Sequence, residues 1–200
     1  MRRVLSLAAV VALSACGELW NNPYPAADAG QRILYSAFIE RPKHLDPVQS
    51  YTEDEARFTQ QIFEPPLQYH YLKLPYELIP LTASELPQPV TLDDGQSTRY
   101  EIRIRPGIRY QPHPAFVAEN RSLEPSAIER LDSPYALPLG TRELTADDYI
   151  YQIKRLAHPR LHSPIFGLMS QYIVGLEDYA ATLRRADTRP EVWLDLRRFP

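Results

Sequence analysis

A short stretch of alternating apolar and charged residues, flanked by two glycine turns, constrains the fold more than any other part of the chain. The alternating residues are Tyr100, Glu101, Ile102, Arg103, Ile104 and Arg105. A period of two places the apolar and charged sets on opposite faces of a strand, so we predict a half-buried β-strand here. Asp94-Gly95 before it and Pro106-Gly107 after it have the residue types of tight turns, and a second short run, Ile108 to Tyr110, follows. Residues 93–113 are therefore predicted to form a strand, a turn and a second strand.

Two other segments have the pattern of helix starts. Residues 52–55, Thr-Glu-Asp-Glu, have capping-box spacing, and apolar residues follow at helical intervals until Pro65. A second helix is predicted from Thr145 to just before Pro159, with a Lys154-Arg155 pair in its last turn, where cations complement the helix dipole. These two helices are the most strongly patterned of the chain.

The remaining segments are predicted from apolar runs and proline positions. A nearly continuous apolar run at residues 33–39 predicts a strand buried on both faces. Residues 180–186 continue a helical pattern, and residues 126–131 have that of a single helical turn. The polar, proline-punctuated segment 114–143 is interpreted as an inserted surface excursion. Strands and helices together predict a mixed α/β fold, with 44% hydrophobic residues to build its core.

The first residues have the organisation of a secretory leader. Met1-Arg2-Arg3 is basic, residues 4–13 are apolar, and Leu13-Ser14-Ala15-Cys16 ends in small residues. The apolar run is shorter than the roughly 20 residues of a membrane-spanning helix, so residues 1–15 are predicted to be a signal peptide. The last four residues resemble a bacterial lipobox, which implies that Cys16 is lipidated; the alternative is that Cys16 merely follows an ordinary cleavage site. Residues 16–31 lack any apolar period and are interpreted as a tether.

Charge and motif content exclude several classes of function. Removing the leader leaves 20 basic and 25 acidic residues, a formal charge of −5 that argues against a nucleic-acid partner. The adjacent carboxylates Asp93-Asp94 and Asp147-Asp148 are explained by turn and cap positions. The five histidines are scattered, and no nucleophile or phosphate-loop motif occurs. We therefore predict no catalytic residues, no metal site and no cofactor.

The order of several short motifs resembles that of family 5 extracellular solute-binding proteins, the peptide, nickel and oligosaccharide receptors of ABC importers. The motifs are Leu45-Asp46-Pro47, Glu64-Pro65-Pro66-Leu67-Gln68-Tyr69, the Asp93-Asp94-Gly95 turn with its strand, Leu144-Thr145-Ala146-Asp147-Asp148 with Lys154-Arg155, and Ile173-Val174-Gly175 with Tyr179. The chain departs from the family pattern by one extra proline at residues 65–66. It also departs at residues 114–143, where the family has a short turn.

The resemblance implies a periplasmic-binding-protein type II-like lobe, in which a mixed sheet is flanked by helices. Residues 32–200 would be its N-terminal part, incomplete without a C-terminal lobe. The implied function is capture of peptides or other small solutes by hinge closure, without catalysis, for an ABC permease in the inner membrane. The protein would lie in the periplasm of a bacterial cell envelope, anchored by lipid to the inner or outer membrane. The alternative is an envelope lipoprotein of the same fold that acts in adhesion or assembly.

The implied ligand contact is Gln49-Ser50-Tyr51, because the chain after Leu-Asp-Pro borders the cleft in these receptors and pairs its backbone with an extended peptide. The alternative is that these residues simply lead into the helix cap. Two other sets of residues also allow either a ligand-binding or a structural interpretation. Arg103 and Arg105 are expected to be solvated or paired with acidic neighbours rather than to anchor a ligand. The tyrosines at 69, 71 and 76 are expected to separate core from surface rather than to line a pocket.

Overall fold

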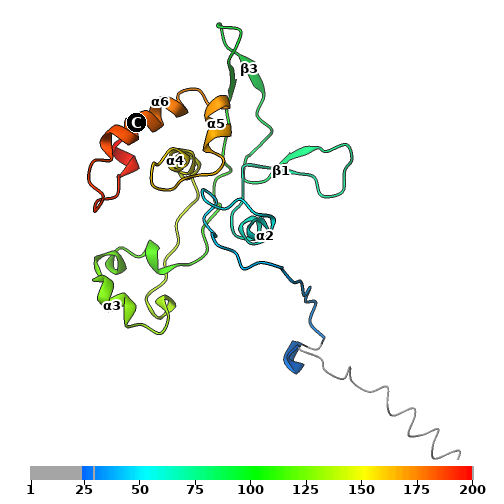
Figure 1. The fold of residues 1–200 in the computed structure, drawn as a ribbon. Helices are drawn as coiled ribbons and strands as arrows, with labels where there is room; N and C mark the ends of the chain where they lie inside the picture. The colour runs from blue at the N-terminus through cyan, green and yellow to red at the C-terminus, as the bar shows by residue number, and fades with distance from the viewer. Residues whose placement is uncertain (1–23, 29, 200) are drawn as a thin grey trace, which may run out of the picture. The chain divides into compact units, whose positions relative to one another are not determined.

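The computed structural model describes residues 24–28 and 30–199 (Figure 1). The predicted signal peptide, residues 1–15, and the predicted lipidation site Cys16 lie outside the described residues. The chain divides into two units, Met1–Ile39 and Glu40–Pro200. The folded domain is predicted from the sequence to start at residue 32, whereas this division falls after Ile39.

The described part of the first unit is held by contacts among tyrosine rings and a carboxylate. The 3-10 helix η1 (Ala26–Asp28) precedes an irregular segment. The rings of Tyr24 and Tyr35 stack with centroids 3.6 Å apart, and the Tyr35 hydroxyl donates to Asp28 Oδ2 at 2.6 Å. The buried strand predicted for residues 33–39 is wrong, because Leu34 and Ile39 are 94% and 97% exposed and no strand forms there. An apolar run becomes a buried strand only where neighbouring strands and a covering layer receive it.

The second unit alternates helices with short strands. Its α-helices are α2 (Glu53–Ile62), α3 (Pro125–Glu129), α4 (Ala146–Leu156), α5 (Phe166–Tyr172) and α6 (Leu176–Ala186). Its strands are β1 (Leu67–Tyr69), β2 (Leu78–Pro80), β3 (Pro89–Thr91) and β4 (Thr98–Tyr100), and its 3-10 helices are η2 (Pro114–Phe116), η3 (Glu119–Ser122), η4 (Pro134–Ala136) and η5 (Leu196–Arg198). The mixed α/β class predicted from the sequence is therefore present.

The strands form two separate antiparallel hairpins. In β1–β2, Leu67 lies opposite Pro80; in β3–β4, Pro89 lies opposite Tyr100. The described residues thus contain two small sheets in place of the single mixed sheet that the resemblance implied. The reason is length, because three-residue strands offer too few backbone groups to recruit further neighbours.

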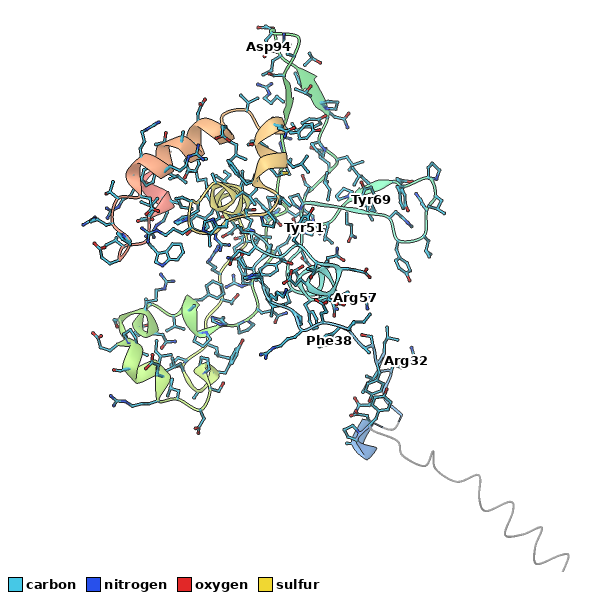
Figure 2. The ribbon with its side chains drawn as sticks, in the orientation of Figure 1. Arg32, Phe38, Tyr51, Arg57, Tyr69 and Asp94 are labelled. Carbon is cyan, nitrogen blue, oxygen red and sulfur yellow. The ribbon has the colours of Figure 1, made fainter. Side chains whose placement is uncertain are left out.

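The segment around residues 93–113 differs from its prediction in where the strand lies. The predicted turn is present, with Gly95 at φ 66° and the Asp94 carboxylate accepting from the N–H of Gln96 and Ser97; Asp94 sits at the hairpin tip (Figure 2). Strand β4 ends at Tyr100, and beyond it Ile104 forms only an isolated bridge with Ala83. Because no layer within the described residues covers this hairpin, Tyr100 is exposed, and the prediction of a half-buried strand is wrong.

The predicted helices are present. Thr52 caps α2 and Thr145 caps α4, each in a capping box with the acidic residue three positions on. Helix α6 begins earlier than the predicted residues 180–186, because Gly175 at φ 82° allows the chain to turn directly into Leu176. The turn predicted at residues 126–131 corresponds to α3.

The main buried cluster lies where α6 and the returning C-terminal segment meet the end of α4. Figure 1 shows α5, α6 and this segment grouped beside α4. The buried members are Ala157, Leu176, Ala180, Leu183 and Leu196, and partly buried side chains such as Phe166, Met169, Tyr179 and Phe199 pack against them. Helix α4 thereby has one side in the core, and its other contacts form the candidate site.

Residues 114–143, the predicted surface excursion, form a folded loop closed at its neck. Antiparallel bridges join Arg109 to Glu143 and His113 to Gly140. Within the loop, the buried Asn120 amide donates to Pro114 O at 2.9 Å and to Pro138 O at 2.8 Å. The excursion is therefore held by its own hydrogen bonds rather than being structureless.

Candidate functional site

The predicted contact residues lie in the loop of residues 43–52 that leads into α2. Tyr51 is 72% exposed, whereas Gln49 and Ser50 are partly buried (Figure 2). This loop contains no regular element, so its shape depends on side chains that bind its backbone. Two carboxylates do this, one on α2 and one in the loop itself.

The carboxylate of Glu55 on α2 organises the loop from inside. Glu55 is only 2% exposed. Its Oε1 accepts from the N–H groups of Lys43 at 3.0 Å and His44 at 2.8 Å, and its Oε2 from those of Tyr51 at 2.9 Å and Thr52 at 3.1 Å. The hydrogen bonds from Tyr51, Thr52 and His44 outweigh the burial and lower the pKa of Glu55 to about 2. One ionised group therefore fixes both ends of the loop.

Asp46 holds the middle of the loop and ties it to α4. Its Oδ1 accepts from Val48 N–H at 3.1 Å, and its backbone carbonyl accepts from the N–H groups of Gln49 and Ser50. Both of its carboxylate oxygens pair with the Arg155 guanidinium, with Oδ1 to Nη1 at 3.0 Å. Burial would raise the pKa of Asp46, but hydrogen bonds from Arg155 and Val48 outweigh it and the pKa is lowered. Arg155, predicted only to complement the helix dipole, thus positions the loop.

This network limits how a ligand could meet the loop. The N–H groups of Gln49, Ser50 and Tyr51 all donate within the protein, to Asp46 O or Glu55 Oε2. A peptide backbone laid along these residues would therefore meet backbone acceptors and side chains, not backbone donors. The predicted backbone pairing is confined to the carbonyl groups, beside the exposed ring of Tyr51.

A second junction joins α4 to the motif at residues 64–66. The Tyr149 hydroxyl donates to Glu64 O at 2.8 Å and accepts from Thr82 Oγ1 at 2.6 Å, and Thr82 Oγ1 also lies 3.3 Å from Pro65 O. Thr82 is fully buried. Helix α4 therefore contacts the chain before β1, the chain after β2 and the loop of residues 43–52.

A third junction, which the sequence reasoning missed, links the neck of the excursion to the start of α4. Arg142 pairs with both oxygens of Asp148, and its guanidinium lies 4.6 Å from the ring centroid of Tyr110 and 5.5 Å from that of Phe116. Burial, followed by the charge of Asp148, raises the pKa of Tyr110. Asp148 was assigned to the helix cap, and it does accept from Thr145 N–H. No periodic pattern marks its second partner Arg142.

The other residues considered as possible ligand contacts, two arginines and three tyrosines, are exposed or paired within the protein. Arg103 forms ion pairs with Glu101 at 3.0 Å and Glu85 at 3.7 Å, as predicted. Arg105 donates to the carbonyl of Leu81 instead of pairing with a carboxylate. Contrary to the expected core boundary, the tyrosines of the β1–β2 hairpin lie in solvent, with Tyr71 94% exposed.

Within the described ranges, no group of three or more His, Cys, Asp or Glu side chains is placed to hold a metal ion. None of the helices in that part of the chain combines the length and apolar character needed to cross a bilayer. Comparison with known proteins gave no match to a family model, to a curated protein or to a solved structure.

Proposed function

We propose that the chain is the N-terminal part of a lipid-anchored solute-binding receptor of an ABC importer, of the family 5 type that its motifs resemble. The receptor captures peptides between two lobes in the periplasm, and the permease recognises its closed form; no catalysis is involved. Its lobe is of the periplasmic-binding-protein type II kind, with a second lobe that completes the sheet and the cleft.

One observation carries the proposal. Residues from motifs far apart in the sequence meet on α4, where Asp46 pairs with Arg155 and Glu64 accepts from Tyr149. The two pairs span 109 and 85 positions. Motifs that belong to one fold are expected to contact one another, and these two contacts meet that expectation. The contacts thus support the resemblance as a property of one structure.

The loop of residues 43–52 suits ligand capture because it is preorganised. Its backbone donors are satisfied by Glu55 and Asp46, so binding a ligand does not require them to be rearranged. The carbonyl groups of residues 49–51 would accept from peptide N–H groups, and the Tyr51 ring would cover an adjacent side chain. Rigid aromatic anchors contribute contact area at low entropic cost.

The test is calorimetric titration of the full-length protein with a mixture of short peptides, alongside thermal unfolding. Peptide binding is expected to raise the melting temperature by linkage. Tyr51→Ala should weaken the affinity about tenfold or more, as expected when a central aromatic contact is removed. The matched control is Tyr172→Ala on α5, whose ring is similarly exposed at 76%. Absence of binding to any peptide in the mixture, or equal loss in both variants, would overturn the proposal.

A second candidate function is adhesion or envelope assembly by a lipoprotein of the same fold. The observation that favours it is the excursion of residues 114–143, which is closed at its neck and presents Tyr135 and Leu139, 59% and 50% exposed. If the protein acts in adhesion or assembly, deleting residues 119–137 should abolish partner binding. If it is a peptide receptor, the same deletion should leave the peptide affinity unchanged. The two functions are therefore separable in one variant.

A further inference from the structure

His158 is a buried imidazole at the end of α4, and its surroundings are not used by the proposed function. It is 4% exposed, and its ring centroid lies 4.9 Å from that of Trp193. Its Nδ1 accepts from Arg160 N–H at 3.1 Å. An imidazole that accepts at Nδ1 is neutral and carries its proton on Nε2. That Nε2 is buried and has no hydrogen-bond partner in the described part of the chain.

Arg160 holds the chain that covers this histidine. Its guanidinium pairs with both carboxylate oxygens of Asp187, with Nε to Oδ2 at 2.9 Å. It also donates to Arg189 O at 2.6 Å and Pro190 O at 2.7 Å, and lies 5.7 Å from the Trp193 ring centroid. Residues 187–193 are thus fastened next to the imidazole.

The same segment continues into the core. Leu196 is 2% exposed, and Lys154 Nζ on α4 donates to Phe199 O at 2.7 Å. We call residues 187–199 the C-terminal strap. Its early part covers His158, and its later part packs on α4 beside α6.

The charges that face His158 make its protonation unfavourable while the strap is in place. Burial is the largest cause and lowers the pKa of His158 below its ordinary value; Arg160 and Arg155 act in the same direction, and Asp187 opposes them. A proton on Nδ1 would also remove the acceptor of Arg160 N–H. Release of the strap relieves the burial of the imidazolium and lets water solvate it.

We propose that the strap is an acid-sensitive latch: it stays closed over the neutral imidazole of His158 and opens when that ring is protonated. The pKa of His158 is lowered while the strap is closed and is about 6.5 when it is open. The contribution of His158 to closure is therefore complete above pH 6.5, and it is lost as the pH falls through the lower closed-state pKa. The inference goes beyond the proposed function and does not depend on it.

Hydrogen–deuterium exchange of the full chain, corrected for intrinsic rates, tests the latch between pH 7 and pH 5. Exchange of residues 187–199 relative to α2 should increase by up to about tenfold for each pH unit between 6.5 and the closed-state pKa. His158→Asn keeps an acceptor near the Nδ1 position but does not titrate, so its strap exchange should be independent of pH. The matched control is His162→Asn, four positions on and exposed, which should behave as the natural chain.

A second measurement avoids dependence on the variants. In an NMR titration of the natural chain, the His158 ring should titrate below the ordinary histidine value of about 6.5, and strap amide signals should change with the His158 midpoint. An imidazole that titrates without any change in the strap would overturn the latch, as would strap exchange that does not vary with pH. Equal pH dependence in the natural chain and a folded His158→Asn variant would overturn it as well.

Discussion

At the scale of single residues, the ionised carboxylate of Glu55 has the largest structural role in the described chain. It accepts four backbone N–H groups from two separate turns of the loop that carries Tyr51. Because Glu55 is buried, removing its carboxylate would leave these four N–H groups facing a buried volume without their acceptor. Its effect on stability should therefore depend on its charge and on pH.

Glu55→Gln tests this role. The amide presents one acceptor oxygen and turns an N–H₂ group toward two of the donors, so the melting temperature at pH 7 should fall by about 5 °C. The ordinary pKa is 4.5 and the folded value is about 2, so the carboxylate stabilises above pH 4.5 and loses this effect as the pH falls through about 2. The gap between natural and variant proteins should thus narrow over that range in thermal scans.

Glu53→Gln is the matched control for this prediction, because Glu53 lies two residues before Glu55 on the same helix. The Glu53 side chain is 83% exposed and forms an ion pair with Arg57 at the surface. Its replacement should shift the melting temperature by about 1 °C or less at every pH. If Glu55→Gln had an equally small effect at pH 7, the loop would not depend on that carboxylate.

The residue scale also shows how far the sequence could predict the candidate site. The Thr52–Glu55 capping box was predictable because both residues lie within one turn of helix. The further bonds from Lys43 and His44, and the Asp46–Arg155 pair, depend on chain segments that meet only after folding. Spacing along the sequence contains no signal for them, so Tyr51 could be chosen by resemblance but not its supporting contacts.

At the scale of elements, the side-chain-capped helices α2 and α4 were predicted well, whereas the strands and the uncapped helix α5 were not, for one physical reason. A helix forms most of its backbone hydrogen bonds within itself, and cap residues such as Thr52 and Thr145 mark its start in the sequence. A strand needs a neighbouring strand to accept and donate its backbone hydrogen bonds, and the apolar pattern of residues 33–39 does not identify such a neighbour. Likewise, of the alternating residues 100–105 only Tyr100 belongs to β4, because pairing with β3 ends there.

The neck of the excursion yields a prediction at this scale. A Cβ on Gly140 would lie 3.0 Å from Val117 Cγ2 and 3.2 Å from the carbonyl carbon and oxygen of Phe116. Since the Phe116 backbone is held by η2, Gly140→Ala should destabilise the chain by about 1–3 kcal/mol in urea unfolding, the usual cost of overpacking. It should also make residues 114–143 more sensitive to limited proteolysis.

The control for the neck is another glycine in open surroundings. A Cβ on Gly167, in α5, would meet no atom within 4 Å. Gly167→Ala should leave the excursion unchanged and stabilise the chain by up to about 1 kcal/mol through helix propensity. A Gly140→Ala protein as stable as the natural one would mean that the neck is not closely packed.

At the scale of the whole molecule, apolar side chains are divided between a small buried cluster and uncovered hairpins. Leu183 on α6 is fully buried in that cluster, whereas Leu72 and Leu74 on the β1–β2 hairpin are 79% and 80% exposed. An isolated two-stranded hairpin is marginally stable in water. Under the proposed function, a second lobe would cover this surface.

The uncovered hairpin predicts how the 200-residue chain behaves when purified. It should bind the dye ANS in its native state, since contiguous exposed apolar groups attract it. Tyr71→Ser with Leu72→Ser should reduce dye fluorescence at least about twofold while changing the unfolding free energy by about 0.5 kcal/mol or less, as expected for solvent-exposed positions.

Leu183→Ala, in the buried cluster, should instead cost about 2–5 kcal/mol and leave native dye binding at the hairpin intact, provided the variant is measured while folded. If the double substitution destabilised the chain as much as Leu183→Ala, the hairpin would be packed within this chain, and no separate lobe would be needed to cover it.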